Sequence, residues 1–346
     1  MTILHTESSL GWGGQEIRVF QDACSFRDEG YRILLAAPAE SLIYKRMNEA
    51  GFEVFPFSFR WRNLWKLGHI IRLQGVKIIN THSSKDSWMG GVAARLFSCK
   101  VVRTRHLSTP VKRGLNSIVL YRYLADTLVT TCQITADILQ KQSGQKKCVS
   151  IPTGLKIEGI KLRYDLREKF GISPTDFVVG TLCVLRSWKG VQGLLSAAAL
   201  CQDLPITWLI VGDGPMLSRL KIQAKNLKKV IFTGHVEPPY EALAAMDIFT
   251  LLSIANEGVS QATIQAASLG KPLITSNVGG LPEVCLEGIT GFITNSPEKT
   301  AYYVKLFYND PELRETMGLA GKALVNGSFT SIQTFNKMKE VYDQFL

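Results

Sequence analysis

At 346 residues, with 46% hydrophobic and 20% charged side chains, the chain has the length and composition of a globular protein with two domains of ordinary size. Its formal charge of +11 is concentrated in residues 1–155, which carry 21 lysines and arginines against 11 aspartates and glutamates. This asymmetry favours an acidic partner for the first half, either an anionic membrane, an acidic glycolipid or a nucleic acid. A basic surface that only aids solubility remains the alternative.

The opening segment MTILHTESS lacks both a basic region and a long apolar run, and no run of 18 apolar residues occurs. We therefore expect neither a signal peptide nor a transmembrane helix. The seven cysteines are dispersed without a Cys-x-x-Cys pair, which is typical of reduced thiols in a cytosolic protein. We expect a cytoplasmic location, with peripheral attachment to the inner face of the plasma membrane left open.

Short apolar strands alternate with helical patterns through the first half, which predicts parallel α/β layers. The expected strands are 2–5, 32–37, 54–58, 78–82, 101–105, 127–131 and 149–152. The turn Gly11-Trp12-Gly13-Gly14 follows the first strand and would let the backbone approach a ligand. It is not a G-x-G-x-x-G dinucleotide fingerprint. His82 and His106 each stand at the end of a strand, and we expect them at the carboxyl edge of the sheet, where open α/β sheets bind ligands.

The segment 57–72 mixes aromatic and basic side chains. If it is helical, Trp61, Leu64 and Trp65 share one face. This face either packs into the core, or it docks the first half on an anionic membrane together with the basic segment 95–113.

The second half begins after the turn Ile151-Pro152-Thr153-Gly154 and repeats the alternation of strands and helices. Residues 297–326 are expected to be helical, and residues 331–346 to form a last helix. The most informative stretch is 253–283, where Glu257-Gly258 precedes a helical run over 262–269 and the turn Gly279-Gly280 follows a short strand. A loop that opens a helix presents free N–H groups and a positive dipole end, which suits a phosphate or the polar face of a sugar. Taken alone, Glu257 would be read as a surface acid that caps the helix.

This stretch resembles the donor-site signature of family 4 glycosyltransferases of the GT-B fold. Glu257 matches the first acid of that signature, and Gly279, Gly280 and Glu283 match its later positions. Gln265 stands where the family usually has a second acid that contacts the nucleotide ribose, and an amide can still form hydrogen bonds there.

The resemblance implies an α/β fold of the GT-B type, with two Rossmann-like domains facing a central cleft. Residues 1–153 would form the acceptor-side domain and 154–330 the nucleotide-sugar domain, with the helix 331–346 packing back on the first domain.

The resemblance also assigns roles to individual residues. Glu257, His106 and Lys189 would be catalytic. Lys189 and Arg186 would grip the donor diphosphate, although the family usually places this arginine further upstream, at about Val184. Further donor contacts are implied for Gly13, Gly14, Gly258, Val259, Ser260 and Gln265.

The implied activity is retaining transfer of a sugar from a nucleotide-diphospho-sugar to a glycan or a lipid-linked acceptor of the lipopolysaccharide type. No cofactor is expected beyond this co-substrate, and no metal, because no Asp-x-Asp motif or zinc spacing is evident. Two alternatives remain. One is a nucleotide-sugar epimerase of the same fold, against which the Glu257 signature argues. The other is a non-catalytic module that binds nucleotide sugars or nucleic acid. Since no nucleic-acid-binding motif appears, nucleic acid is not an expected partner.

Overall fold

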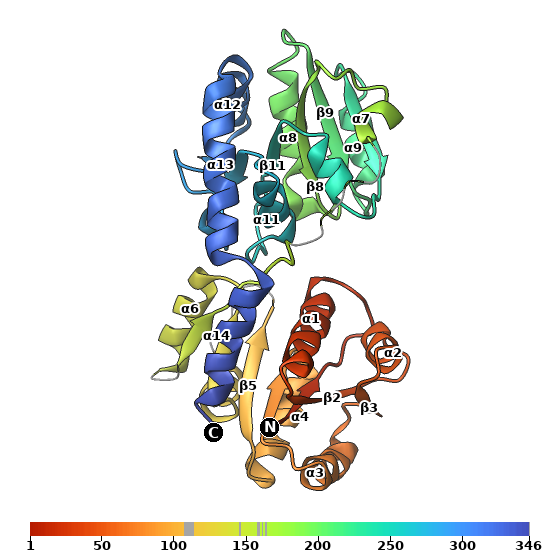
Figure 1. Cartoon of the computed structure of the whole chain (residues 1–346), viewed down its shortest axis with the longest axis vertical. Helices are drawn as coiled ribbons and strands as arrows, with labels where there is room; N and C mark the ends of the chain where they lie inside the picture. The colour runs from red at the N-terminus through yellow and green to blue at the C-terminus, as the bar shows by residue number, and fades with distance from the viewer. Residues whose placement is uncertain (107–113, 145–146, 158–159, 161, 163–164, 346) are drawn as a thin grey trace. The chain divides into compact units, whose positions relative to one another are not determined.

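The structure is a computed structural model that describes residues 1–106, 114–144, 147–157, 160, 162 and 165–345. The chain forms two compact units, one of Met1–Thr153 with Ile332–Leu346 and one of Gly154–Ser331. Each unit is built on one parallel sheet covered by helices (Figure 1). The predicted α/β class with two Rossmann-like units is confirmed, and each unit is described here by itself.

The sheet of the first unit has seven strands in the order β3-β2-β1-β4-β5-β6-β7, and all neighbouring pairs are parallel. They are β1 (Thr2–Thr6), β2 (Arg32–Ala37), β3 (Glu53–Pro56), β4 (Ile78–Thr81), β5 (Lys100–Arg105), β6 (Thr127–Thr130) and β7 (Cys148–Ser150). The strand order turns at β1, which has β2 on one side and β4 on the other. Side chains that follow β1, β4 and β5 therefore meet at one stretch of the carboxyl edge.

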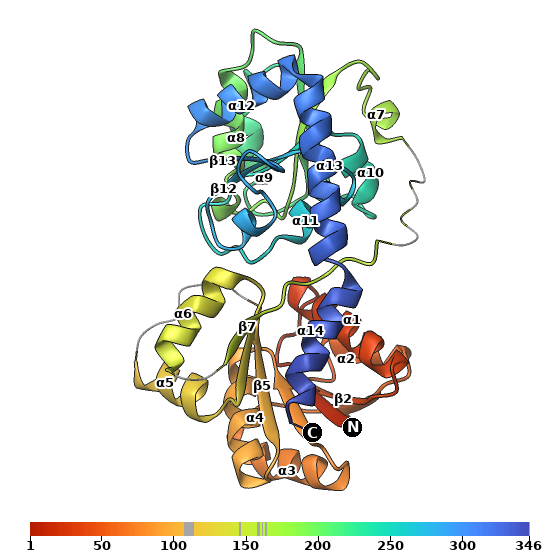
Figure 2. The ribbon, with the colours of Figure 1, turned by 60° about the vertical axis from the view of Figure 1, so that its left-hand side comes forward.

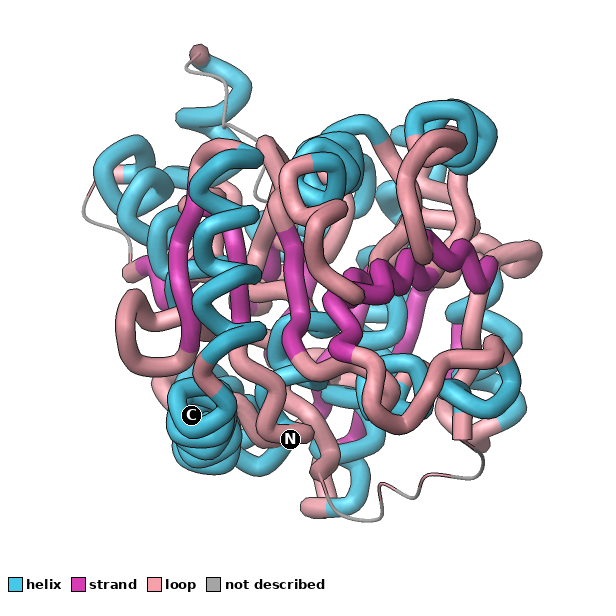
Figure 3. Tube along the Cα trace, turned by 90° about the horizontal axis from the view of Figure 1, so that it is seen from above, coloured by secondary structure: helices cyan, strands magenta, loops and turns pink. Residues whose placement is uncertain are grey.

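Helices cover both faces of this sheet. Figure 3 distinguishes the helices of the chain, in cyan, from its strands, in magenta. They are α1 (Gly14–Asp28), α2 (Leu42–Glu49), η1 (Trp61–Asn63), α3 (Leu64–Leu73), α4 (Ser84–Leu96), α5 (Leu115–Ile118), η2 (Val119–Tyr123), α6 (Gln133–Ser143) and α14 (Ser331–Asp343). Because side chains alternate along a strand, Leu4 packs with α3 and α4 whereas Ile3 packs with α1, α2 and α14.

The C-terminal helix α14 belongs to the core of the first unit (Figure 2). Tyr342 is fully buried and packs against Phe26, and its hydroxyl accepts a hydrogen bond of 2.7 Å from Asn80 Nδ2. Thr104 in turn donates to Asn80 Oδ1 at 2.9 Å. These bonds link α14 to β4 and β5. The helix also covers apolar surface of the sheet.

The sheet of the second unit has six parallel strands in the order β10-β9-β8-β11-β12-β13. They are β8 (Phe177–Leu182), β9 (Ile206–Val211), β10 (Val230–Gly234), β11 (Ile248–Leu251), β12 (Leu273–Ser276) and β13 (Gly291–Thr294). The helices are α7 (Leu166–Lys169), η3 (Ser187–Lys189), α8 (Val191–Ala199), α9 (Leu217–Gln223), α10 (Tyr240–Ala244), α11 (Gln261–Ser268), η4 (Leu281–Glu283), α12 (Pro297–Asn309) and α13 (Pro311–Ser328). Here the order turns between β8 and β11, so their carboxyl ends flank the switch point.

The structure adds detail to one local expectation and decides between two alternatives in another segment. Residues 297–326 are helical as expected except at Asp310, and they belong to two helices, because Pro311 has no N–H for a continuous helix and the Asp310 side chain caps α13 by accepting a bond from Leu313 N at 2.9 Å. In the segment 57–72, Phe57 is buried, and the buried face of α3 consists of Leu67, Gly68 and Ile71. Trp61 and Trp65 are instead 58% and 70% exposed, which rules out their assignment to the core.

Candidate active site

Lys189 lies in a tight turn at the end of β8. The 3-10 turn η3 ends at Lys189, and Gly190 follows in the left-handed conformation, with φ of 72°. A Cβ atom on Gly190 would lie only 1.8 Å from the carbonyl oxygen of Leu252, just after β11. Position 190 therefore requires glycine for two reasons. Its φ is positive, and the close approach of the two loops leaves no room for a side chain.

Glu257 receives two short hydrogen bonds on one carboxylate oxygen. Lys189 Nζ and Ser253 Oγ each lie 2.6 Å from Glu257 Oε1. The Glu257 side chain is 5% exposed and that of Lys189 is 19% exposed, so the ion pair is largely removed from water. The structure thus brings together two of the predicted catalytic residues, and it adds Ser253, which the sequence analysis had not singled out.

The backbone around Glu257 is fixed on both sides. Asn256 has φ of 60°, an uncommon conformation for a residue other than glycine. Gly279 also has a positive φ, and a Cβ atom there would lie 1.8 Å from the carbonyl oxygen of Glu257. The Gly-Gly turn after β12 therefore supports the loop that carries the acid, which gives a physical reason for these glycines.

The helix α11 begins directly beyond this acid. Ser260 is its N-cap and its side chain makes no capping hydrogen bond, while Gly258 and Val259 form the preceding loop. The first N–H groups of the helix are thus not satisfied by the cap side chain and point toward its N-terminal end. Together with the Lys189 ammonium group, this end suits an anion such as a diphosphate.

The structure also locates the other two predicted donor residues of this unit. Arg186 is exposed, and its guanidinium carbon lies 5.1 Å from the centre of the Trp188 ring. Val184, at the position where the family usually has the arginine, is also exposed. Gln265 is half-buried on α11 and its side chain bonds the hydroxyl group of Tyr240. Among the described residues, Lys189 and Ser253 donate hydrogen bonds to the Glu257 carboxylate, and neither Arg186 nor Gln265 does so.

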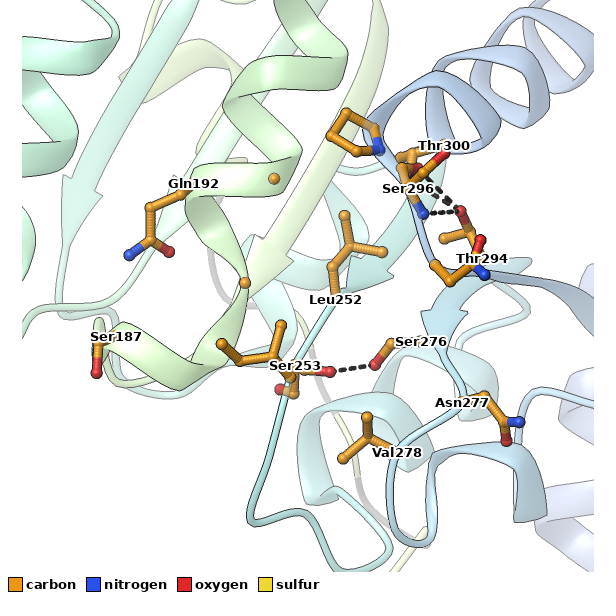
Figure 4. A pocket seen from close by; sticks show the side chains of 15 residues that line it. Ser187, Gln192, Leu252, Ser253, Ser276, Asn277, Val278, Thr294, Ser296 and Thr300 are labelled. Atoms are coloured by element: carbon orange, nitrogen blue, oxygen red, sulfur yellow. Dashed lines mark hydrogen bonds between the residues drawn. The ribbon is translucent and has the colours of Figure 1, made fainter.

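Ser253 also lines a pocket of about 590 Å³ (Figure 4). It is lined by the loops that follow β8, β11, β12 and β13, and none of its lining residues carries a charge. Ser253 and Ser276 face each other in it, and Ser276 Oγ donates to the Ser253 carbonyl. Hydroxyl and amide groups over an apolar floor suit a neutral polar ligand better than a diphosphate. This pocket could have been found from the sequence, because a residue with a hydroxyl group stands at or just after the end of each of three strands. These residues are Ser253, Ser276 and Thr294.

In the first unit, His106 lies at the end of a chain of three histidine rings. Its Nε2 atom is 3.0 Å from His82 Nδ1, and His82 Nε2 is 2.9 Å from His5 Nδ1. The sequence analysis identified His82 and His106 from the strand ends. It missed His5, because a histidine inside the first strand looks like an ordinary core residue.

Two buried acids accompany this chain. Glu7 accepts hydrogen bonds from Gln15 Nε2 and the Ser83 hydroxyl. Asp86 accepts from the His82 and Ser83 N–H groups, at 2.8 and 3.2 Å. Burial, and then the charge of Glu7, raises the pKa of Asp86 to about 7, and burial also raises the pKa of Glu7. The sequence analysis did not identify either acid, although each directly follows a strand or opens the next helix.

At the glycine turn before α1, one backbone N–H group already has a hydrogen-bond partner within the protein. Gly13 is the N-cap of α1, and its N–H donates to Glu16 Oε2 at 2.8 Å. Gly13 and Gly14 are both exposed. In this structure a carboxylate of the chain therefore already occupies the N-terminus of α1.

Comparison with known proteins places the chain in one family. Residues 12–158 match the family model described as Glycosyltransferase Family 4, and residues 163–324 match the model described as Glycosyl transferases group 1. The N-acetyl-alpha-D-glucosaminyl L-malate synthase of Bacillus anthracis is 30% identical over 183 residues, which are 51% of this chain and 48% of that protein. The chain thus matches only about half the length of this relative.

Other similarities extend further along the chain. The UDP-Gal:alpha-D-GlcNAc-diphosphoundecaprenol alpha-1,3-galactosyltransferase of Escherichia coli is 26% identical over 309 residues, 81% of this chain and 79% of that protein. The crystal structure of HepE from Anabaena in complex with UDP superposes with a TM-score of 0.89 at 22% identity, covering 99% of this chain and 100% of that one. The fold, the Glu257 and Lys189 motifs and the two adjoining family matches agree, and the chain belongs to the family 4 glycosyltransferases of the GT-B fold.

Proposed function

We propose that this protein is a retaining glycosyltransferase that moves a sugar from a nucleotide-diphospho-sugar to a glycan or lipid-linked acceptor. The observation that carries the proposal is the Lys189–Glu257 ion pair beside the start of α11. It combines a cation, helical N–H groups and a buried carboxylate at the switch point of the second sheet. Such a set can bind a diphosphate and, next to it, the hydroxyl groups of a sugar.

In the proposed reaction, the bond between the anomeric carbon and the diphosphate oxygen breaks. A bond from the anomeric carbon to an acceptor hydroxyl oxygen forms, and the hydroxyl proton leaves with the nucleoside diphosphate. Negative charge develops on the departing diphosphate, where Lys189 and the N–H groups of α11 stabilise it. Glu257 would orient Lys189 and accept a hydrogen bond from the donor sugar.

A metal ion is not needed in this proposal, because Lys189 supplies positive charge at the diphosphate. In the described part of the chain, His, Cys, Asp and Glu side chains form no group of three that would hold a metal.

The lipid-linked acceptor is proposed from the relatives. The Escherichia coli enzyme named above is described as acting on a diphosphoundecaprenol-linked sugar, and a relative from Streptococcus pneumoniae is described as an alpha-monoglucosyldiacylglycerol synthase. Such acceptors lie at a membrane surface. Among the described residues, no helix is long and apolar enough to cross a membrane.

A surface of the first unit suits peripheral attachment to an anionic membrane. Trp61 and Trp65 are exposed beside the exposed cations Arg60, Arg62 and Lys66. A cavity of about 370 Å³ next to them is lined by Phe59, Trp61, Ser84, Lys85, Trp88, Met89 and Asn116. Exposed tryptophans and basic residues are typical of proteins that bind the interface of anionic bilayers. Of the basic segment 95–113, residues 107–113 lie outside the described part of the chain.

Co-sedimentation with liposomes tests this attachment. We expect binding to vesicles containing phosphatidylglycerol that weakens with salt and falls at least about fivefold in the Trp61→Ala/Trp65→Ala variant, because both membrane anchors are lost. Ile222→Ala, on an exposed apolar residue of the second unit, is the matched control. Equal binding to neutral phosphatidylcholine vesicles, or no binding to either, would contradict it.

A transfer assay tests the activity. Nucleoside diphosphate release is measured over a panel of nucleotide sugars, with and without a short-chain lipid diphosphate-linked sugar as the acceptor. We expect release that depends on the acceptor and is nearly abolished in Glu257→Ala. Tight binding of nucleotide sugar without any release would favour the non-catalytic module, and conversion of the free nucleotide sugar to an epimer would favour the epimerase.

A further inference from the structure

The three buried histidines of the first unit form one continuous hydrogen-bonded chain. It runs from β1 through the loop after β4 to the end of β5, with N–N distances of 2.9 and 3.0 Å. The rings of His5 and His82 are parallel within 1°, with centres 5.2 Å apart, and those of His82 and His106 are also 5.2 Å apart. His5 and His82 are buried, and His106 is half-buried.

All three rings are neutral near pH 7. Burial lowers the pKa of His5 to about 4 and that of His106 to about 3, and burial together with the charge of His106 lowers the pKa of His82 well below its usual value. The cations Arg18 and Arg103 act in the same direction on His82 and His106. Asp86 does not reverse this, because its carboxylate bonds the backbone N–H of His82 rather than the ring.

Neutral rings leave only two arrangements of protons. Each neutral imidazole carries one N–H, and two of the three N–H groups are used in the two bonds between rings. If the bonds run from His106 toward His5, the third N–H is on His5 Nε2. If they run from His5 toward His106, the third N–H is on His106 Nδ1.

The two ends of the chain are not equivalent. His5 Nε2 is buried and has no hydrogen-bond partner among the described residues. A buried N–H without an acceptor is rarer and more costly than an acceptor atom that lacks a donor. At the other end of the row of histidines, the outer ring nitrogen is Nδ1 of His106, whose ring is only half-buried. The second arrangement is therefore favoured, with protons on Nδ1 of all three rings.

We propose that His5 and His82 are positioning residues that hold His106 in the Nδ1–H tautomer, so that its outer nitrogen donates a hydrogen bond to a substrate oxygen and does not act as a base. The substrate part of this proposal rests on the proposed glycosyl transfer. The relevant oxygen is a sugar hydroxyl or a phosphate oxygen, both of which accept from an N–H group.

Nitrogen-15 NMR spectra of the histidine rings in the full chain test the tautomer directly. The chain has only five histidines, so His69→Gln and His235→Gln, both at exposed positions, assign the two other signals. We expect His5, His82 and His106 to carry the proton on Nδ1 at pH 7. A proton on Nε2 of His106 would overturn the proposal, whether or not the protein transfers sugar.

Two variants of His82 test the positioning role. His82→Phe removes both ring nitrogens, so His106 is free to adopt either tautomer, and we expect kcat to fall about tenfold while KM for the nucleotide sugar changes less than about twofold. His82→Gln keeps an N–H that can donate to His106 Nε2, and we expect it to retain the Nδ1–H signal and most of kcat. Thermal denaturation checks that both variants are folded.

The outcomes separate the possible failures. Unchanged kcat in folded His82→Phe, or an equal loss in His82→Gln with the tautomer retained, would overturn the positioning role. If the wild-type protein transfers no sugar at all, the proposed function fails, whereas the ring spectra still decide whether the chain of histidines fixes His106.

Discussion

The Lys189–Glu257 pair predicts an unusual pattern of stabilities in a double-mutant cycle. In Lys189→Met, the Glu257 carboxylate keeps only its bond to Ser253 and stays almost fully buried. Removing one partner of a buried pair costs about 3–5 kcal/mol, and because Lys189 is 19% exposed we expect the lower end, about 3 kcal/mol. Glu257→Gln should cost about 1 kcal/mol, since the lysine left behind can reach water.

The double variant Lys189→Met/Glu257→Gln should lie within about 1 kcal/mol of the wild type, because no uncompensated charge remains buried. The two units can unfold separately, so the free energy of unfolding is best measured by amide hydrogen exchange in β8 and β11 over a urea series. Lys305→Met, which breaks an exposed ion pair with Asp203, is the control and should change stability by less than about 0.5 kcal/mol. A double variant as unstable as Lys189→Met would refute the reasoning.

Three further predictions concern ligand binding, metals and pH. Lys189→Ala should weaken binding of UDP by about 2–3 kcal/mol in calorimetry, because a largely buried phosphate partner is lost, and equal affinities would place Lys189 outside the phosphate site. EDTA should leave the initial rate of transfer unchanged, whereas a loss restored by magnesium or manganese would contradict the role of Lys189 as the cation at the diphosphate. His5 has a folded-state pKa of about 4 against about 6.5 in the unfolded chain, so the unfolded state binds more protons and stability falls as the pH drops through this window. At low pH, His5→Gln should make the first unit about 3 kcal/mol less sensitive to acid than the wild type is. Identical pH profiles of urea denaturation in the two proteins would contradict the lowered pKa of His5.

The parts of the fold that follow local rules were predictable from the sequence. Apolar runs that end at polar residues placed His82 and His106 at strand ends, and the Gly279-Gly280 pair indicated a turn in which a side chain on Gly279 does not fit. The Glu257 loop was identified through its resemblance to a family signature, because local signals alone favoured an acid that caps the helix.

The parts that depend on strand order were not predictable in this way. Nothing local in Thr2–Thr6 shows that β1 pairs with β4, and only that pairing brings His5 to His82 and Thr6 to Asp86. The exposure of Trp61 and Trp65 depends likewise on which face of α3 meets α4, and the spacing of the apolar residues alone left both faces open.

The central claim is retaining glycosyl transfer at the Lys189–Glu257 site, and the anomeric configuration of the product tests it most directly. The purified protein is incubated with the nucleotide sugar that gives release in the panel and with the lipid diphosphate-linked acceptor, and the product is analysed by proton NMR. The account predicts an α-linked product from an α-configured donor, formed by the wild type and not by Glu257→Ala. A β-linked product, or the same α-linked product from folded Glu257→Ala at an undiminished rate, would contradict it.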